Sequence, residues 1–218
     1  MNYKQTIATN WMLFLKSKKN IFSLAISFLS TVVMLHLIAK FITKIEYRSG
    51  FAFDDPLLSL FQPINLSWVI FFFLYVSVLF SFFILLQNPE KLILAFFSYA
   101  FLLLLRTTCM YLLPLDPPKD IILLKDPIIE YFGTERALTR DLFFSGHTSL
   151  VVLLFLLVKS KPARLFLSFS VIVVAFGVLL QKAHYTVDVL VAFFAAYCSY
   201  SWTQFVLKKF KIIDGTNP

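Results

Sequence analysis

The sequence is poor in charge and in glycine. Of its 218 residues only 15% are charged and five are glycine, whereas 59% are hydrophobic and 27 are phenylalanine. A soluble domain of ordinary composition would be about one quarter charged and about half apolar. The shortage of charge therefore excludes a soluble globular enzyme, and the apolar excess excludes a disordered chain. These proportions are typical of an integral membrane protein whose whole length forms one helical domain.

Cysteine is also scarce, because the chain has two, Cys109 and Cys198, and both lie inside apolar runs. A disulfide framework is therefore not expected, and each thiol is interpreted as a small buried hydrophobic group. The net charge of +8 could indicate a nucleic-acid partner. The basic residues, however, lie at the edges of apolar segments, where membrane topology explains them, so no nucleic-acid partner is expected.

Six apolar segments approach the length of about 20 residues that a helix needs to cross a bilayer. They cover residues 21–41, 68–86, 92–113, 142–158, 165–180 and 183–207. The sequence thus predicts an all-α, polytopic membrane protein with six transmembrane helices. Its expected parts are a cytoplasmic or interfacial segment at 1–20, a six-helix membrane domain at 21–207 and a basic cytoplasmic tail at 208–218.

The orientation of these segments follows from the distribution of basic residues. Eleven basic and two acidic residues lie in the N-terminus, in the connections that follow the second and the fourth segment, and in the C-terminal tail. The connections on the opposite face carry eight basic and nine acidic residues. By the positive-inside rule, both termini are expected in the cytoplasm.

Four ionisable side chains lie in or at the ends of the apolar segments, where they are costly and mark functional sites by default. Arg106 comes seven residues before Leu113, which is roughly 10 Å from the outer end of its helix at the usual rise. His147 begins the fourth segment, and His184 and Asp188 begin the sixth. The predicted topology places all four near the outer surface, although they come from three separate segments.

The spacing of these residues favours phosphoryl transfer. His184 and Asp188 are four apart, so a helix places both on one face, where the carboxylate can orient the imidazole. Ser145 can cap the helix that follows it, and the free N–H groups of that first turn form an anion site. The same residues could instead form a metal site, a proton relay or a contact between helices. No Cys or Glu partner stands beside the histidines, which disfavours zinc.

At these residues the sequence resembles the sphingomyelin synthases. DLFFSGHTS at 141–149 is similar to their third motif, and HYTVDVLVAFFAAY at 184–197 is similar to their fourth. LRTTCMYLLPLDPP at 105–118 is similar to the second, and DDPLLSLFQPINLSW at 54–68 more weakly to the first. The resemblance places the chain on the sphingomyelin-synthase-like branch of the lipid phosphate phosphatase superfamily, also called the type 2 phosphatidic acid phosphatases. The short loops resemble those of a bacterial member.

The resemblance implies a role for each matching residue and implies that neither a metal nor a cofactor is needed. His184 would be the nucleophile that forms a phosphohistidine, Asp188 would orient it, and His147 would act first as general acid and then as general base. The residues expected to contact phosphate are Arg106, Ser145, Gly146 and Lys182, the last of which could instead extend to the membrane interface. The outer acids that could meet a cationic headgroup such as choline or ethanolamine, or could simply be solvated, are Asp54, Asp55, Asp116 and Asp141.

The sequence departs from the family pattern at four positions. Tyr99 and Val178 stand where the phosphatase branch has Lys and Arg, which favours the synthase-like branch. Cys109 replaces a Thr of the second synthase motif, and Arg140 stands where Gly would precede Asp141. These changes leave the identities of the headgroup and the acceptor open.

The expected function is transfer of a phospho-headgroup from a phospholipid to a lipid hydroxyl such as that of ceramide. Hydrolysis by a phosphatase or a phospholipase C-like enzyme would use the same residues, with water as acceptor. A lipid-binding or transport protein that keeps the fold is a third, non-enzymatic possibility. The expected location is a bacterial inner membrane with the site facing the periplasm.

Overall fold

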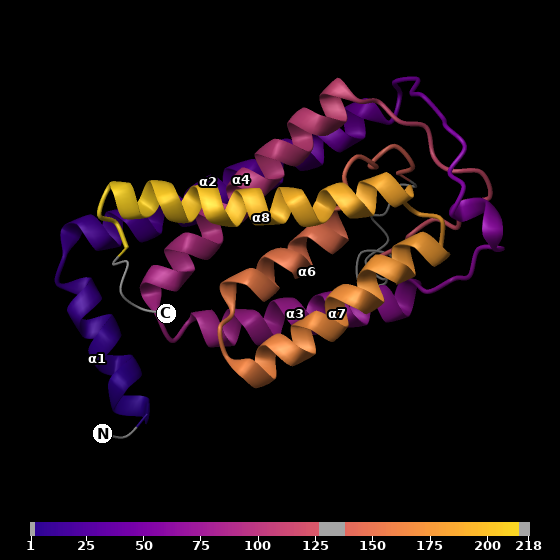
Figure 1. Cartoon of the computed structure of the whole chain (residues 1–218). Coiled ribbons are helices and arrows are strands. Elements are labelled where there is room, and N and C mark those ends of the chain that lie inside the picture. The colour runs from indigo at the N-terminus through magenta and orange to yellow at the C-terminus, as the bar shows by residue number, and fades with distance from the viewer. Residues whose placement is uncertain (1–2, 127–137, 214–218) are drawn as a thin grey trace.

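The computed structural model describes residues 3–126 and 138–213, and over these residues the protein is helical (Figure 1). Seven α-helices and one short 3-10 helix are described there. Their bounds are α1 Tyr3–Leu15, α2 Lys18–Ile45, η1 Leu58–Leu60, α3 Ser67–Leu85, α4 Pro89–Leu112, α6 Gly146–Leu157, α7 Lys161–Leu180 and α8 Thr186–Lys209. No strand is found in these two ranges, where a single bridge pairs Phe51 with Leu115. The all-helical fold expected from the sequence is confirmed.

Five helices are long and apolar enough to cross a membrane, namely α2, α3, α4, α7 and α8. They coincide with five of the six expected segments to within five residues at each end. The remaining segment, expected at 142–158, is helical only over the 12 residues of α6. Such a helix rises about 18 Å, which is less than the hydrocarbon core of about 30 Å. The part of the chain described therefore contains five long apolar helices and one short one, which indicates an integral membrane protein.

The outward faces of these helices carry large apolar side chains, as expected for contact with lipid. Phe22 of α2 is 67% exposed and Phe194 of α8 is 70% exposed. The buried face of α2, by contrast, carries the small residues Ser23, Ser27 and Thr31. Thr31 Oγ1 donates to the carbonyl of Phe96 on α4 at 2.8 Å. Small hydroxyl residues at a helix contact, with large apolar residues outside, are typical of packing inside a bilayer.

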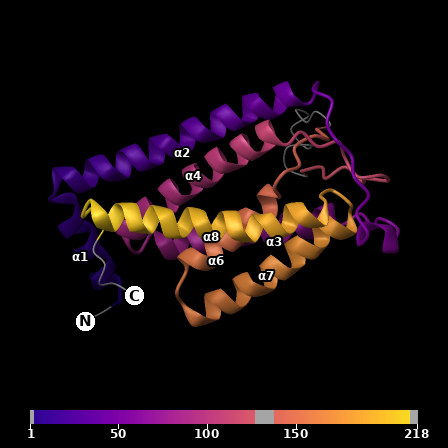
Figure 2. The ribbon, with the colours of Figure 1, turned by 45° about the horizontal axis from the view of Figure 1, so that its top comes forward.

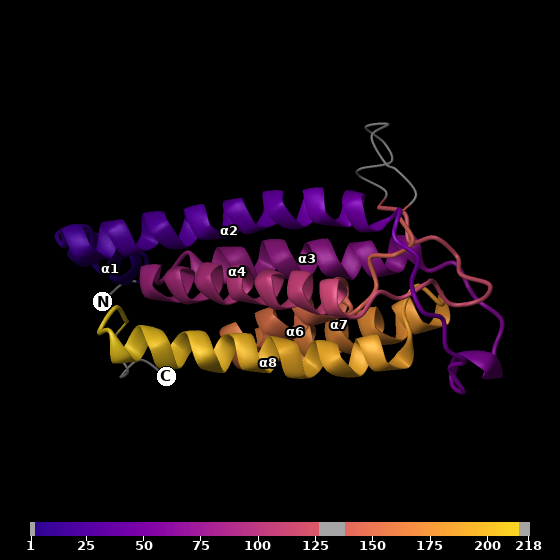
Figure 3. The same ribbon diagram turned by 90° about the horizontal axis from the view of Figure 1, so that it is seen from above.

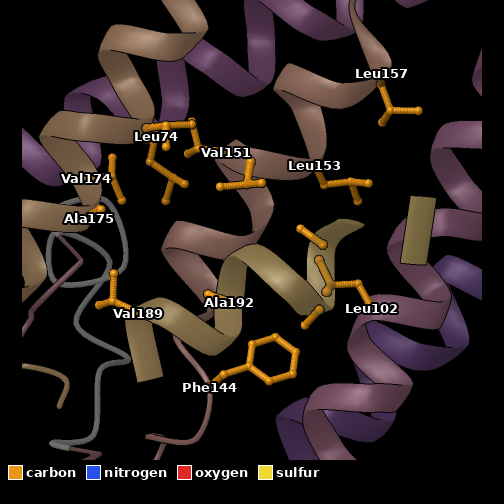
Figure 4. Close-up of a cluster of buried hydrophobic side chains, with 14 of the residues drawn as sticks. Leu74, Leu102, Phe144, Val151, Leu153, Leu157, Val174, Ala175, Val189 and Ala192 are labelled. Carbon is orange, nitrogen blue, oxygen red and sulfur yellow. The ribbon is translucent and has the colours of Figure 1, made fainter. Parts of the chain in front are cut away.

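The short helix α6 is the centre of the bundle, because it packs against α3, α4, α7 and α8. Figure 4 shows side chains of all five helices meeting around Val151 and Leu153, which are almost completely buried. Helices α2 and α4 form a further pair on one side of α8, and α3 packs on α7 (Figure 2). Most residues of α6 are buried, so this helix presents little surface to lipid.

The loops that follow α2, α4 and α7 gather at one end of the bundle, opposite the N- and C-termini (Figure 3). We call it the loop end; α2, α4 and α7 finish there, and α3, α6 and α8 begin there. At the other end, Trp11 Nε1 of α1 donates to the carbonyl of Leu86 at 2.8 Å. Lys19 Nζ donates to the carbonyl of Lys211 at 2.9 Å, which joins the start of α2 to the end of α8. The last five residues of the expected basic tail, 214–218, lie outside the described residues.

The close approach of α3 and α7 at Gly177 can be tested by substitution. A Cβ at Gly177 would lie 2.7 Å from Cγ1 of Ile70, a residue with no exposed surface. We expect Gly177→Ala to lower the free energy of unfolding by about 1–3 kcal/mol, because the two helices must separate. Thermal unfolding in detergent measures this, and Ile70→Ala in the same chain should restore part of the loss. An unchanged unfolding temperature in Gly177→Ala would contradict the close packing.

Candidate active site

The four ionisable residues singled out from the sequence come from α4, α6 and the start of α8, and these three helices pack on one another. Arg106 lies in the last two turns of α4, His147 in the first turn of α6, and Asp188 in the first turn of α8. Arg106 lies against Gly146, directly before His147, and the amide of Ser145 donates to the carbonyl of Asp188 at 3.1 Å. The fold therefore brings the four residues together at the loop end.

His184 and Asp188 form a buried pair. Nδ1 of the imidazole lies 3.3 Å from Oδ2 of the carboxylate, and neither side chain is more than 4% exposed. The same Oδ2 accepts a hydrogen bond from the backbone amide of Tyr185 at 3.0 Å. A carboxylate at this distance from Nδ1 favours the tautomer with hydrogen on Nδ1, which leaves the lone pair on Nε2.

Arg106 is held by the segment that leads into α6. Its Nε donates to the carbonyl of Phe144 at 2.8 Å, and Nη2 lies 2.8 Å from Oδ1 of Asp141. That Oδ1 accepts no hydrogen bond within the described ranges, so its contact with Nη2 is an ion pair. Nη1 has no hydrogen-bond partner among the described residues. The guanidinium is therefore fixed in place with one nitrogen available.

Gly146 allows this arginine to approach the helix start. A Cβ at Gly146 would lie 2.8 Å from Cζ of Arg106, so the position tolerates no side chain without displacing the guanidinium. Ser145 caps α6, since its Oγ accepts from the amide of Thr148 at 3.4 Å and donates to Thr148 Oγ1 at 3.1 Å. The amides of Gly146 and His147 donate to no described residue. Free amides at a helix start beside a guanidinium form a site for an anion.

The aromatic residues of α3 that pack beside His147 were not predicted from the sequence. The ring of Phe71 on α3 meets the imidazole edge to face, with centroids 5.3 Å apart. Tyr75, one turn further along α3, stacks on Phe71 and donates a hydrogen bond to Asp126. A tyrosine inside an apolar span and an acid after the apolar run 121–124 were the only sequence signals.

Lys182 and Gln181 lie in the turn between α7 and α8. Lys182 is 7% exposed, and Nζ lies 5.8 Å from the ring centre of Phe61. Gln181 is completely buried, accepts from the amide of Leu66, and donates to Ser67 Oγ and to the carbonyls of residues 122 and 123. Gln181, which sequence reasoning missed, thus joins the turn to the start of α3 and to the loop after α4.

The four outer acids considered for a headgroup all have partners. Asp54 forms an exposed ion pair with Lys119 at 3.1 Å. Asp141 pairs with Arg106, as above, and Oδ1 of Asp116 pairs with Nη2 of Arg140 at 2.8 Å. Asp55 accepts hydrogen bonds from the amide and the hydroxyl of Thr186. No group of three or more His, Cys, Asp or Glu side chains within residues 3–126 and 138–213 is placed to hold a metal ion.

The comparisons with known proteins gave a single finding. Residues 140–205 match the family model described as PAP2 superfamily C-terminal. This match supports the PAP2 superfamily, and it spans α6, α7 and most of α8, with His147, His184 and Asp188 inside it. Arg106 lies outside the matched range. No curated protein and no solved structure matches the chain.

The fixed position of Arg106 generates a stability prediction. Arg106→Met leaves the Phe144 carbonyl and the Asp141 carboxylate without their partner, so we expect a loss of about 1–3 kcal/mol in the free energy of unfolding. Lys119→Met, which removes an exposed ion pair, should change it by less than about 1 kcal/mol. Thermal unfolding of both variants in one detergent makes the comparison. Equal stability of the two would show that Arg106 is not held as described.

Proposed function

We propose that the protein is a membrane lipid phosphotransferase. It moves a phospho-headgroup from a glycerophospholipid to a lipid hydroxyl, such as that of ceramide, through a phosphohistidine on His184. The observation that carries this proposal is the buried His184–Asp188 pair, in which Nδ1 of the imidazole lies 3.3 Å from Oδ2 of the carboxylate. The pair lies next to the start of α6, where Arg106 and two amides without a described partner are available. The PAP2 match supports an activity of the lipid phosphatase or phosphotransferase type.

In the first half of the reaction, Nε2 of His184 attacks phosphorus and the bond from phosphorus to the diacylglycerol oxygen breaks. His147 donates its proton to that oxygen, which leaves as an alcohol. The positive charge that develops on the phosphorylated imidazole is balanced by Asp188 through Nδ1–H. Because the pair is buried, this compensation is larger than it would be in water.

In the second half, His147 removes the proton of the acceptor hydroxyl. The acceptor oxygen attacks phosphorus, and the bond from phosphorus to Nε2 breaks, which returns His184 to its starting form. Throughout, Arg106 Nη1 and the amides of Gly146 and His147 would stabilise the non-bridging oxygens. Ser145 supports this site as the cap of α6, and Lys182 would add positive charge near the same turn.

The membrane topology is part of the proposal. The four ionisable residues of the candidate site, Arg106, His147, His184 and Asp188, lie at the loop end. The opposite end is rich in lysine and holds Lys18, Lys19, Lys208 and Lys209. With the basic end in the cytoplasm, the site opens toward the outer leaflet, which in a bacterial inner membrane faces the periplasm. In this arrangement α6 and the segment before it together form the sixth crossing, and both termini are cytoplasmic.

The decisive experiment uses purified protein in detergent with a headgroup-labelled phospholipid, with and without ceramide. We expect label in a new lipid only when ceramide is present, and His184→Ala should lower turnover by many orders of magnitude because no covalent intermediate can form. Water-soluble label regardless of ceramide would instead identify a hydrolase. Turnover that His184→Ala leaves intact would contradict the phosphohistidine mechanism of both enzymes, and no turnover of any common phospholipid by the wild type would favour a lipid-binding protein.

The separate roles of the two histidines can be resolved by the choice of leaving group. With a phospholipid donor, we expect His147→Ala to lower the rate by about 10²–10⁴-fold, because the alkoxide leaves unprotonated. With a nitrophenyl phosphodiester, whose leaving group needs no proton, release of the first equivalent of nitrophenol should be nearly normal in His147→Ala and absent in His184→Ala. Equal loss on both donors would argue against His147 as the general acid.

A further inference from the structure

His184 precedes α8, so the first turn of that helix and the residues just before it determine where its imidazole lies. The imidazole is bound to Asp188 inside this turn, but the pair as a whole must be held against the rest of the protein. Three contacts from the segment 50–55, which follows α2 and comes from far away in the sequence, reach residues 185 and 186 or the loop beside them.

The first contact is with Tyr185, whose ring is 1% exposed. Phe53 stacks on it with centroids 4.1 Å apart and planes 24° from parallel. The Tyr185 hydroxyl donates to the carbonyl of Asp116 at 3.0 Å, and burial raises the pKa of this hydroxyl, so it stays a donor. The residue directly after His184 is therefore immobilised on both sides.

The second contact is with Thr186, the first residue of α8. Asp55 Oδ2 accepts from its amide at 2.7 Å, and Oδ1 accepts from its hydroxyl at 3.0 Å. Oδ1 also accepts from the amides of Leu57 at 3.0 Å and Leu58 at 3.3 Å. A single carboxylate thus caps both α8 and the turn that contains η1.

The third contact holds the segment itself. Phe51 donates its amide to the carbonyl of Pro114 at 2.9 Å and accepts from the amide of Asp116 at 3.1 Å, so it is paired with the chain that leaves α4. The Gly50 amide donates to Oδ1 of Asp116 at 3.2 Å. The segment 50–55 is therefore fixed at one end to the exit of α4, which carries Arg106, and at the other end to the start of α8.

From this geometry we infer that Asp55 is a positioning residue, which sets the place of the His184–Asp188 pair by holding Thr186. This rests on the proposed function, because the pair is the centre of the proposed reaction. It assigns Asp55 to the enzyme itself and not to the headgroup of the substrate. The other reading, in which the charge of Asp55 binds a cationic headgroup, makes a different prediction for the asparagine variant.

The test compares Asp55→Ala with Asp55→Asn in the headgroup-transfer assay. Asparagine can keep both contacts with Thr186, because its oxygen can accept from the Thr186 amide while its NH2 donates to the hydroxyl. It loses only the contacts with the amides of Leu57 and Leu58, which lie at the start of η1 and not in α8. We expect Asp55→Ala to lower kcat by up to about 100-fold, because a displaced nucleophile no longer aligns with phosphorus, with KM changed by less than about twofold. Asp55→Asn should lose less than about fivefold. Thr186→Val should add nothing in the Asp55→Ala background.

Asp120→Asn is the matched control, because Asp120 is an exposed acid of the same face with φ of 58°, where asparagine is well tolerated. It should match the wild type. Equal damage by Asp55→Asn and Asp55→Ala, with KM raised for cationic and not for anionic headgroups, would overturn the inference in favour of headgroup binding. Wild-type kcat in Asp55→Ala would also overturn it.

Hydrogen exchange separates this inference from the proposed function. In Asp55→Ala, the amides of residues 186–189 should exchange at least about 10-fold faster than in the wild type, because the cap of α8 is lost. If the wild type turns over no phospholipid while this change is seen, the proposed function fails and the positioning by Asp55 stands. Unchanged exchange at these amides would overturn the positioning, whatever the activity.

Discussion

Asp188 is the residue on which the rest of the site depends. Its carboxylate contacts Nδ1 of His184 and accepts from the Tyr185 amide, while its backbone carbonyl accepts from the amide of Ser145 at 3.1 Å. One completely buried residue thus joins the imidazole on the α8 side to the helix start of α6. Both of these side-chain contacts are made by Oδ2, whereas the buried Oδ1 has no hydrogen-bond partner among the described residues.

The shortness of α6 has a consequence for the chemistry. A helix that crossed the whole bilayer would place its first amides at the membrane surface, whereas α6 begins at Gly146, beside the guanidinium of Arg106 within the last turns of α4. The positive end of the helix dipole therefore lies within the bundle, where a low dielectric strengthens its attraction for an anion. The irregular chain before α6 is acceptable there because Arg106 binds its carbonyls.

Much of the fold was predictable from the sequence, since long apolar runs mark helices directly, and α2, α3, α4, α7 and α8 lie where the runs are. The meeting of Arg106, His147, His184 and Asp188 was also predictable, because topology alone sends them to one end. The partner of each acid was not predictable, as the contacts of Asp55 with Thr186 and of Asp116 with Arg140 show. Those contacts join loops 131 and 24 residues apart, and no periodic pattern records them.

Three helices begin at the loop end, and the starts of two of them, α6 and α8, differ in a way that suits different parts of the proposed reaction. At α8 the first amides already meet the carboxylates of Asp55 and Asp188, so a phosphate there would be repelled by two negative charges. At α6 a neutral serine is the cap, Arg106 lies against Gly146, and two amides have no described partner. In the proposed reaction, the carboxylates that would repel phosphate at α8 would also balance the positive charge of a phosphorylated His184, while Arg106 and the amides at the start of α6 would hold the non-bridging oxygens.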